Sequence, residues 1–233
     1  MARKSDLRVQ RANTVINAIS SAQEKALARA LRSVQGRLSE EFPGLVLRHE
    51  PQWRLSDVVG RLRTSFPEVD FHYYFETSAM KPDGGILSII SKTQNAYPIL
   101  ITEKKNQGTN DLRVAEGKRK QAKGNAIERL GKNVIGFRTA MKMETIFPFV
   151  CFGDGCDFDK TSSILDRVVT IAQFGHLNKE YLHHVGRHSQ FDRGTFYFRE
   201  APWTEEEMAK LAGDIAVKSV YYYFSKYGKS SFI

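Results

Sequence analysis

Cysteine is scarce in this sequence, which has only two, Cys151 and Cys156, among 233 residues. Two cysteines cannot build a disulfide framework, and a zinc site would need further ligands at suitable spacing. Cys151 lies within the apolar segment 149–152, and free cysteine behaves as a small hydrophobic residue. We therefore expect Cys151 to be a buried free thiol.

Long apolar segments are also absent. No stretch reaches the roughly eighteen consecutive apolar residues that a membrane-spanning helix needs. The opening residues, MARKSD, lead into a polar segment without the apolar core or cleavage site of a signal peptide. We therefore expect no membrane partner and a cytoplasmic location. Repeats, low-complexity tracts and Gly/Ser linkers are missing too, which predicts a single domain over residues 1–233.

Positive charge, by contrast, is in excess. The chain has 35 Lys and Arg residues against 26 Asp and Glu residues, a formal net charge of +9. Such an excess favours a polyanionic partner, but nucleic-acid-binding, ribosomal and membrane-surface proteins all share it. Charge alone therefore leaves the partner open.

Hydrophobic periodicity predicts an α/β domain. We expect helices at 5–40, within an N-terminal helical segment 1–40, and at 55–62, 111–132, 162–174 and after Thr204. Ser56 is a candidate cap for the second helix, and Thr204 and Glu207 form a capping box for the last. We expect strands at 86–90, 97–102, 147–152 and 196–199, and the aromatic segment 70–75 is β-prone. Mixed helices and strands indicate a layered domain.

We expect the polar residues 92–96 to join the strands 86–90 and 97–102 as a hairpin. A potential catalytic constellation lies in this hairpin. Asp83 belongs to the motif KPDGG before the first strand, while Glu103 and Lys105 follow the second. Alternate residues of a strand face the same side, so Glu103 and Lys105 project together and the hairpin can bring Asp83 beside them. Two adjacent carboxylates repel unless a cation lies between them, and hard oxygen ligands suit Mg²⁺. This pattern is typical of phosphodiester hydrolysis.

A structural interpretation competes with this one. Pro-Asp-Gly is a common turn, and Glu-x-Lys is common on exposed strands. However, only Thr102 separates Glu103 from the apolar run 97–101. A charge so close to a buried strand usually has a partner or a function.

A basic segment at 106–130 is the candidate DNA-recognition segment. Its charged residues are Lys118, Arg119, Lys120, Lys123 and Arg129, with Glu128 among them. A solvated helix face is the alternative interpretation. In the functional one, the cations neutralise phosphates, and Asn125 and Arg129, one helical turn apart, contact base edges. Gly124 allows the backbone to approach the bases closely.

Three motifs together, MKPDGG (80–85), EKKNQG (103–108) and GNAIER (124–129), resemble the EcoRI restriction endonuclease family. The resemblance implies the PD-(D/E)xK nuclease fold, a mixed five-stranded sheet flanked by helices, with a catalytic core at 70–152. It implies that Asp83 and Glu103 bind Mg²⁺ with help from the main-chain carbonyl of Lys104. It also implies that Lys105 is the catalytic lysine.

The same resemblance implies the DNA target. Asn125, Ala126 and Arg129 would read the inner AATT bases of a palindrome such as GAATTC, and Glu128 would pair with an arginine of the other subunit of a homodimer. Products would carry 5′-phosphate and 3′-hydroxyl ends, and a companion DNA adenine methyltransferase is implied. The stretch between Lys105 and Gly124 is short for the family, and no motif identifies the residues that read the outer base pair.

Two other functions remain open from the sequence. A repair or junction-resolving nuclease could share Asp83, Glu103 and Lys105 but should lack the GNAIER motif. A non-catalytic DNA-binding protein would need only the basic segment.

Overall fold

The computed structural model describes residues 16–106, 125–160, 162–184, 186–191 and 193–233. A five-stranded sheet has the order β1-β4-β5-β6-β7. Its strands are β1 (Val46–Glu50), β4 (Gly85–Ile90), β5 (Ala96–Asn106), β6 (Phe149–Asp154) and β7 (Thr195–Arg199). The short strands β2 (Trp53–Arg54) and β3 (Ala79–Met80) form a separate pair.

The sheet is mixed, as the sequence predicted. Strand β4 is antiparallel to both of its neighbours, β1 and β5, whereas β5, β6 and β7 run parallel to one another. The central strand β5 therefore has an antiparallel neighbour on one side and a parallel one on the other. It is also the longest strand, with 11 residues, and its last residues pair with β6 alone.

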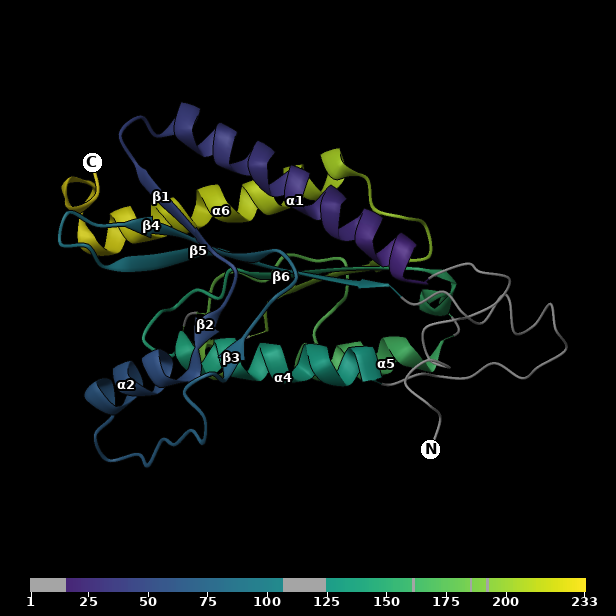
Figure 1. Ribbon diagram of the computed structural model, residues 1–233, viewed down its shortest axis with the longest axis horizontal. Helices are drawn as coiled ribbons and strands as arrows, with labels where there is room; N and C mark the ends of the chain where they lie inside the picture. Colours follow the sequence, from purple (N-terminus) through teal and green to yellow (C-terminus); the bar gives the residue numbers. More distant parts are fainter. Residues whose placement is uncertain (1–15, 107–124, 161, 185, 192) are drawn as a thin grey trace, which may run out of the picture.

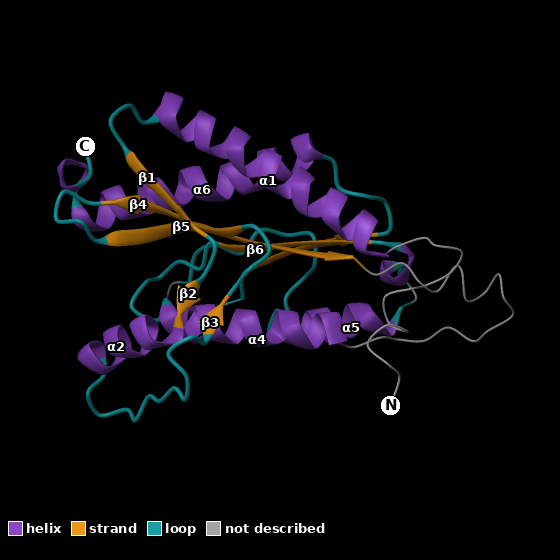
Figure 2. Ribbon diagram, viewed as in Figure 1, coloured by secondary structure: helices purple, strands orange, loops and turns teal. Residues whose placement is uncertain are grey.

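Helices cover both faces of the sheet (Figures 1 and 2). The helices α1 (Ile16–Glu41) and α6 (Glu205–Tyr227) lie on one face, and α2 (Leu55–Ser65), α4 (Asn125–Ala140) and α5 (Ser163–Ile171) lie on the other. Single 3₁₀ turns occur at Cys156–Phe158, Gly186–Gln190 and Lys229–Ser231. Each face has its own apolar core, which burial of side chains stabilises. None of the described helices is long and apolar enough to cross a membrane.

The expected hairpin is formed by β4 and β5, and Pro98 is the third residue of β5. The pairing shifts there: Leu87 faces Leu100 while Ser88 faces Pro98, so Ile99 has no counterpart. This bulge accommodates the missing proline N–H.

Three local expectations were wrong. The first concerns the segment 70–75, which forms no strand: within the described chain no strand pairs with it, and Tyr74 is 87% exposed.

The other two concern helices. The helix expected to end at 132 continues to Ala140. A Cβ at Gly136 would lie 2.4 Å from Met80 Sδ, so this glycine permits close packing and does not end the helix. Ser56 does not cap α2, because the N-cap position is Arg54.

Other local expectations are confirmed. The capping box of Thr204 and Glu207 begins α6, and Cys151 is a buried free thiol. The expected helix start at 111 lies outside the described residues.

Candidate active site

Asp83 is presented by a tight turn immediately before β4. Gly85 N donates to the Pro82 carbonyl at 3.1 Å, and Gly84 N donates to the Thr102 carbonyl at 2.9 Å. Gly85 has φ +75°, and a Cβ there would lie 2.6 Å from the Glu50 carbonyl oxygen. The turn therefore requires glycine, and it holds Asp83 opposite the end of β5.

Glu103 and Lys105 lie on one side of β5, as the alternation of strand residues predicts. Lys105 Nζ donates to Asp83 Oδ2 at 2.9 Å and also forms an ion pair with Glu103 Oε1. The ammonium thus lies between the carboxylate of Asp83, in the turn before β4, and that of Glu103, in β5. The Glu103 side chain is only 2% exposed, whereas that of Asp83 is 31% exposed. Asp83 is therefore the more accessible of the two acids.

Two backbone N–H groups also donate hydrogen bonds to these carboxylates. Asp83 N donates to Glu103 Oε2 at 3.3 Å, and Lys104 N donates to Asp83 Oδ2 at 3.1 Å. In an extended strand the N–H and C=O of one residue point to the same side. The Lys104 carbonyl therefore faces Asp83, which is the side on which the sequence-based hypothesis needs it.

Asn133 is a site residue that the sequence analysis missed. Its Nδ2 lies 3.2 Å from Glu103 Oε1, 3.3 Å from Glu103 Oε2 and 3.5 Å from the Lys81 carbonyl oxygen. One signal was available. Asn133 follows Arg129 by four residues, so the two lie on the same face of a helix.

Burial and charge act together on these groups. Burial raises the pKa of the Glu103 carboxyl, and Asp83 adds to that effect while Lys105 opposes it. For Lys105, burial lowers the pKa, but Glu103 and Asp83 raise it more, and the net change is upward. The ammonium therefore stays protonated. Cys151 pairs with Glu103 in the sheet, and burial raises the pKa of its thiol well above the ordinary value.

The donor set suits a hard divalent cation. Asp83 and Glu103 could offer carboxylate oxygens to such a cation, and the Lys104 main chain, whose N–H donates to Asp83 Oδ2, could offer its carbonyl. No group of three or more His, Cys, Asp and Glu side chains gathers within the described ranges. Mg²⁺ is commonly held by one or two carboxylates, with waters and substrate phosphate completing its shell. Two acids and a carbonyl match that requirement.

The sequence profile of the family described as "Restriction endonuclease EcoRI" matches residues 9–164, well over half of the chain. The chain belongs to the EcoRI restriction endonuclease family. It is accordingly an enzyme, a type II restriction endonuclease, and the resemblance read from its three motifs is confirmed. Its mixed five-stranded sheet with flanking helices is consistent with the restriction-endonuclease-like fold.

Individual restriction enzymes were also compared with this chain, two by sequence and one by structure. The type II restriction enzyme RsrI of Cereibacter sphaeroides is 28% identical over 241 residues, covering 89% of this chain and 87% of that protein. The type II restriction enzyme EcoRI of Escherichia coli is 29% identical over 147 residues, 60% of this chain and 53% of that protein. The crystal structure of MunI restriction endonuclease with cognate DNA aligns with 90% of this chain and 96% of that one, at 17% identity and a TM-score of 0.31.

The residues predicted from the sequence to bind DNA fall into two groups. Asn125 and Ala126 begin α4, and Glu128 and Arg129 are exposed on its first turn. Ile127, between them in sequence, is buried, so the first turn of α4 is anchored to the core. The remaining members, Lys118, Arg119, Lys123 and Gly124, lie outside the described residues.

Proposed function

We propose that this restriction endonuclease cuts both strands of a short palindromic DNA site with an inner AATT core, such as GAATTC. Cleavage depends on Mg²⁺ and leaves 5′-phosphate and 3′-hydroxyl ends. The observation that carries the chemistry is the convergence of Asp83 and Glu103 on Lys105 Nζ. Two acids and an amine gathered at one point are the groups that metal-assisted phosphodiester hydrolysis requires.

Each site residue has a distinct task in this proposal. Asp83 and Glu103, with the Lys104 carbonyl, would hold the cation. When bound, Mg²⁺ lowers the pKa of a coordinated water and neutralises charge on the phosphate. Lys105, which contacts both acids, would stabilise negative charge on the scissile phosphate, or orient the attacking water and help to deprotonate it. Asn133 fixes the orientation of the Glu103 carboxylate through two contacts.

Recognition is assigned to the first turn of α4. Asn125 pairs with an adenine edge, Ala126 packs against a base, and Arg129 reaches purine acceptors in the major groove. Lys118, Arg119 and Lys123 neutralise DNA phosphates, and Gly124 allows the protein backbone to approach the bases closely. The roles of the three cations rest on the basic segment, and the base contacts rest on the GNAIER motif. The exposure of Arg129 in the structure supports its part.

A palindromic site also requires symmetry in the protein. We propose a homodimer with one active site for each DNA strand, in which Glu128 pairs with an arginine of the partner. An enzyme that cuts unmodified sites endangers its host's own DNA. The proposal therefore includes a companion DNA adenine methyltransferase that protects those sites, and a cytoplasmic location for this endonuclease.

Incubation of the purified protein with plasmid DNA and Mg²⁺ tests the proposal. Discrete fragments are expected, and run-off sequencing of the ends gives the site and the cut position. Asp83→Ala and Glu103→Ala should abolish cutting while binding to the site persists. Asp70→Ala, which removes an exposed carboxylate from a loop, is the matched control and should cut normally.

The rival functions predict other results. Structure-selective nicking would indicate a junction-type nuclease, and a gel shift without any cutting would indicate a non-catalytic binding protein. Undiminished site-specific cleavage by either carboxylate variant would refute the assignment of the active site.

A further inference from the structure

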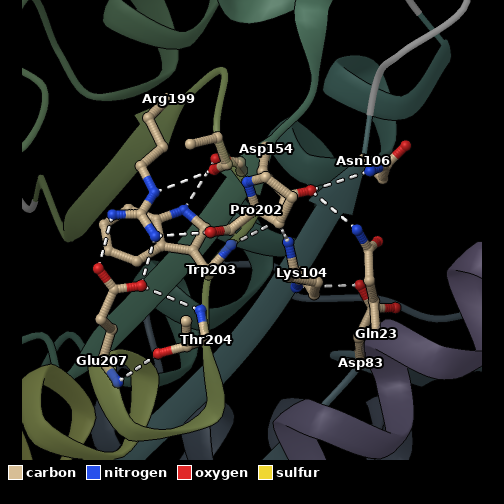
Figure 3. Close-up of polar contacts among 12 residues, drawn as sticks. Gln23, Asp83, Lys104, Asn106, Asp154, Arg199, Pro202, Trp203, Thr204 and Glu207 are labelled. Atoms are coloured by element: carbon tan, nitrogen blue, oxygen red, sulfur yellow. Dashed lines mark hydrogen bonds and ion pairs between the residues drawn. The ribbon is translucent and has the colours of Figure 1, made fainter.

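The side chain of Lys104 points away from the catalytic acids and enters a buried polar cluster on the other side of β5 (Figure 3). It forms an ion pair with Asp154, the last residue of β6. The two side chains are only 4% and 1% exposed. The chemistry proposed above uses neither of these side chains.

Both oxygens of Asp154 are fully engaged. Its Oδ1 accepts hydrogen bonds from Gln23 Nε2 and Asn106 Nδ2, each at 2.9 Å. Its Oδ2 accepts from Lys104 Nζ and from Trp203 N, the latter at 3.0 Å. The donors come from α1, from the end of β5 and from the loop before α6, so one carboxylate joins three separate parts of the fold.

The loop that carries Trp203 is itself held firmly. The Trp203 indole Nε1 donates to the Gly153 carbonyl at 2.9 Å, and the Arg199 guanidinium lies 3.7 Å from the centre of the Trp203 ring. Arg199 also pairs with Glu207 of the α6 capping box. Asp154 therefore binds a loop that several further contacts hold in place (Figure 3).

The end of β5 needs such a support. The ladder between β4 and β5 ends at the pair Gly85 and Thr102, whereas the ladder with β6 continues to Asn106. The residues from Glu103 onward are thus hydrogen-bonded within the sheet on one side only. On the open side, the Lys104 amide contacts the Asp83 side chain.

Burial of two charges is costly, and apolar residues of similar volume would often stabilise a fold equally well. The position of the pair indicates a more specific role. We propose that Asp154 is a positioning residue: by holding the Lys104 side chain, it fixes the end of β5 and so sets Glu103 and Lys105 against Asp83. This inference rests on the proposed function of those three residues.

Lys104→Met and Asp154→Asn test the inference, with Lys218→Met as the matched control because it breaks an exposed ion pair, the one with Glu180. Both site variants should cleave about 10- to 100-fold more slowly in single-turnover assays. They should also need more Mg²⁺ for half-maximal rate. Their affinity for the DNA site, measured without divalent cation, should stay unchanged, and Lys218→Met should behave as the unmodified protein.

The double variant Lys104→Met/Asp154→Asn separates positioning from stability. It leaves no unpaired buried charge, so its melting temperature should return toward that of the unmodified protein. Its cleavage should stay slow, because the side-chain link is still missing. Cleavage that recovers together with melting would show that the pair acts through stability alone and would overturn the inference, as would single variants with normal rates and normal Mg²⁺ dependence.

A milder variant covers the case in which the charge variants fail to fold. Gln23→Ala removes one neutral donor to Asp154 and should slow cleavage about twofold to tenfold, with a nearly unchanged melting temperature. An unchanged rate would overturn the inference.

Asp83→Ala, run in parallel, provides the reference for an inactive site. If that variant still cuts, the proposed function fails instead, so the two failures are distinguishable.

Discussion

Asn133 Nδ2 contacts both carboxylate oxygens of Glu103, at 3.2 and 3.3 Å. Asn133 belongs to α4, the helix that begins with Asn125 of the recognition motif. Glu103 belongs to the central strand and is almost fully buried. The helix assigned to DNA reading and the strand assigned to cleavage are therefore in direct polar contact, and a shift of α4 on DNA would move the hydrogen-bond donor of a cation ligand.

The first prediction concerns that contact. Asn133→Ala should lower the single-turnover cleavage rate about 10- to 100-fold, because the orienting contacts of a metal ligand typically carry effects of this size. DNA affinity should change much less, and the difference is measured by comparing cleavage with equilibrium binding. Thr139→Ala, an exposed substitution further along α4, is the control. An Asn133→Ala variant that cuts at the normal rate would show that Asn133 has no role in cleavage.

The second prediction concerns pH. Glu103 must be ionised to bind a cation, and burial, then Asp83, raise its pKa above that of an ordinary carboxyl. A proton therefore competes with the cation at a higher pH than at an exposed acid. The Mg²⁺ concentration for half-maximal cleavage should rise as pH falls from mildly alkaline toward that raised pKa. Lys105 cannot cause this trend, because its pKa is shifted upward and it stays protonated throughout.

Mg²⁺ titrations of single-turnover cleavage across that pH range provide the measurement. Glu103→Gln is the control, because it lacks the ionisable group in question, and it should give no cleavage at any pH, however much Mg²⁺ is added. A Mg²⁺ midpoint that stays constant in the unmodified protein while the pH changes would contradict the prediction.

The catalytic acids and lysine could be predicted because they follow local rules. Turn chemistry places Asp83 before β4, and the alternation of strand residues places Glu103 and Lys105 on one side. The structure brings the three together, as the sequence analysis expected. A structure with Asp83 in solvent and far from Glu103 would have ended the nuclease hypothesis.

The supporting residues could not be predicted in the same way. Asn133 contacts Glu103 across 30 positions of sequence, and Asp154 contacts Lys104 across 50. No motif marks either residue, because their role depends on how helices and strands pack in three dimensions. The end of α4 shows the same limit: the helix was expected to end at 132, but it continues through Gly136, against which Met80 packs, to Ala140.

The third prediction concerns specificity. Arg129→Lys should reduce the preference for the cognate site over sites with one altered inner base pair by about 10- to 100-fold, because lysine lacks the planar fork of arginine. Binding to non-specific DNA should change little, since the charge is kept. Competition between cognate and altered duplexes measures the ratio. An unchanged ratio would mean that Arg129 does not read bases.

The last prediction concerns the turn that presents Asp83. Gly85→Ala should lower the free energy of unfolding by about 2–5 kcal/mol, from a left-handed backbone and a crowded Cβ together. The crowding is with the Glu50 carbonyl and the His49 ring, both 2.6 Å from that Cβ. Gly60→Ala is the matched control: it adds the same methyl group inside α2, with nothing within 4 Å, and should stabilise the protein by about 0.5–1 kcal/mol. Urea denaturation of both variants measures the two changes in the free energy of unfolding. Equal changes would show that the turn does not depend on its glycine.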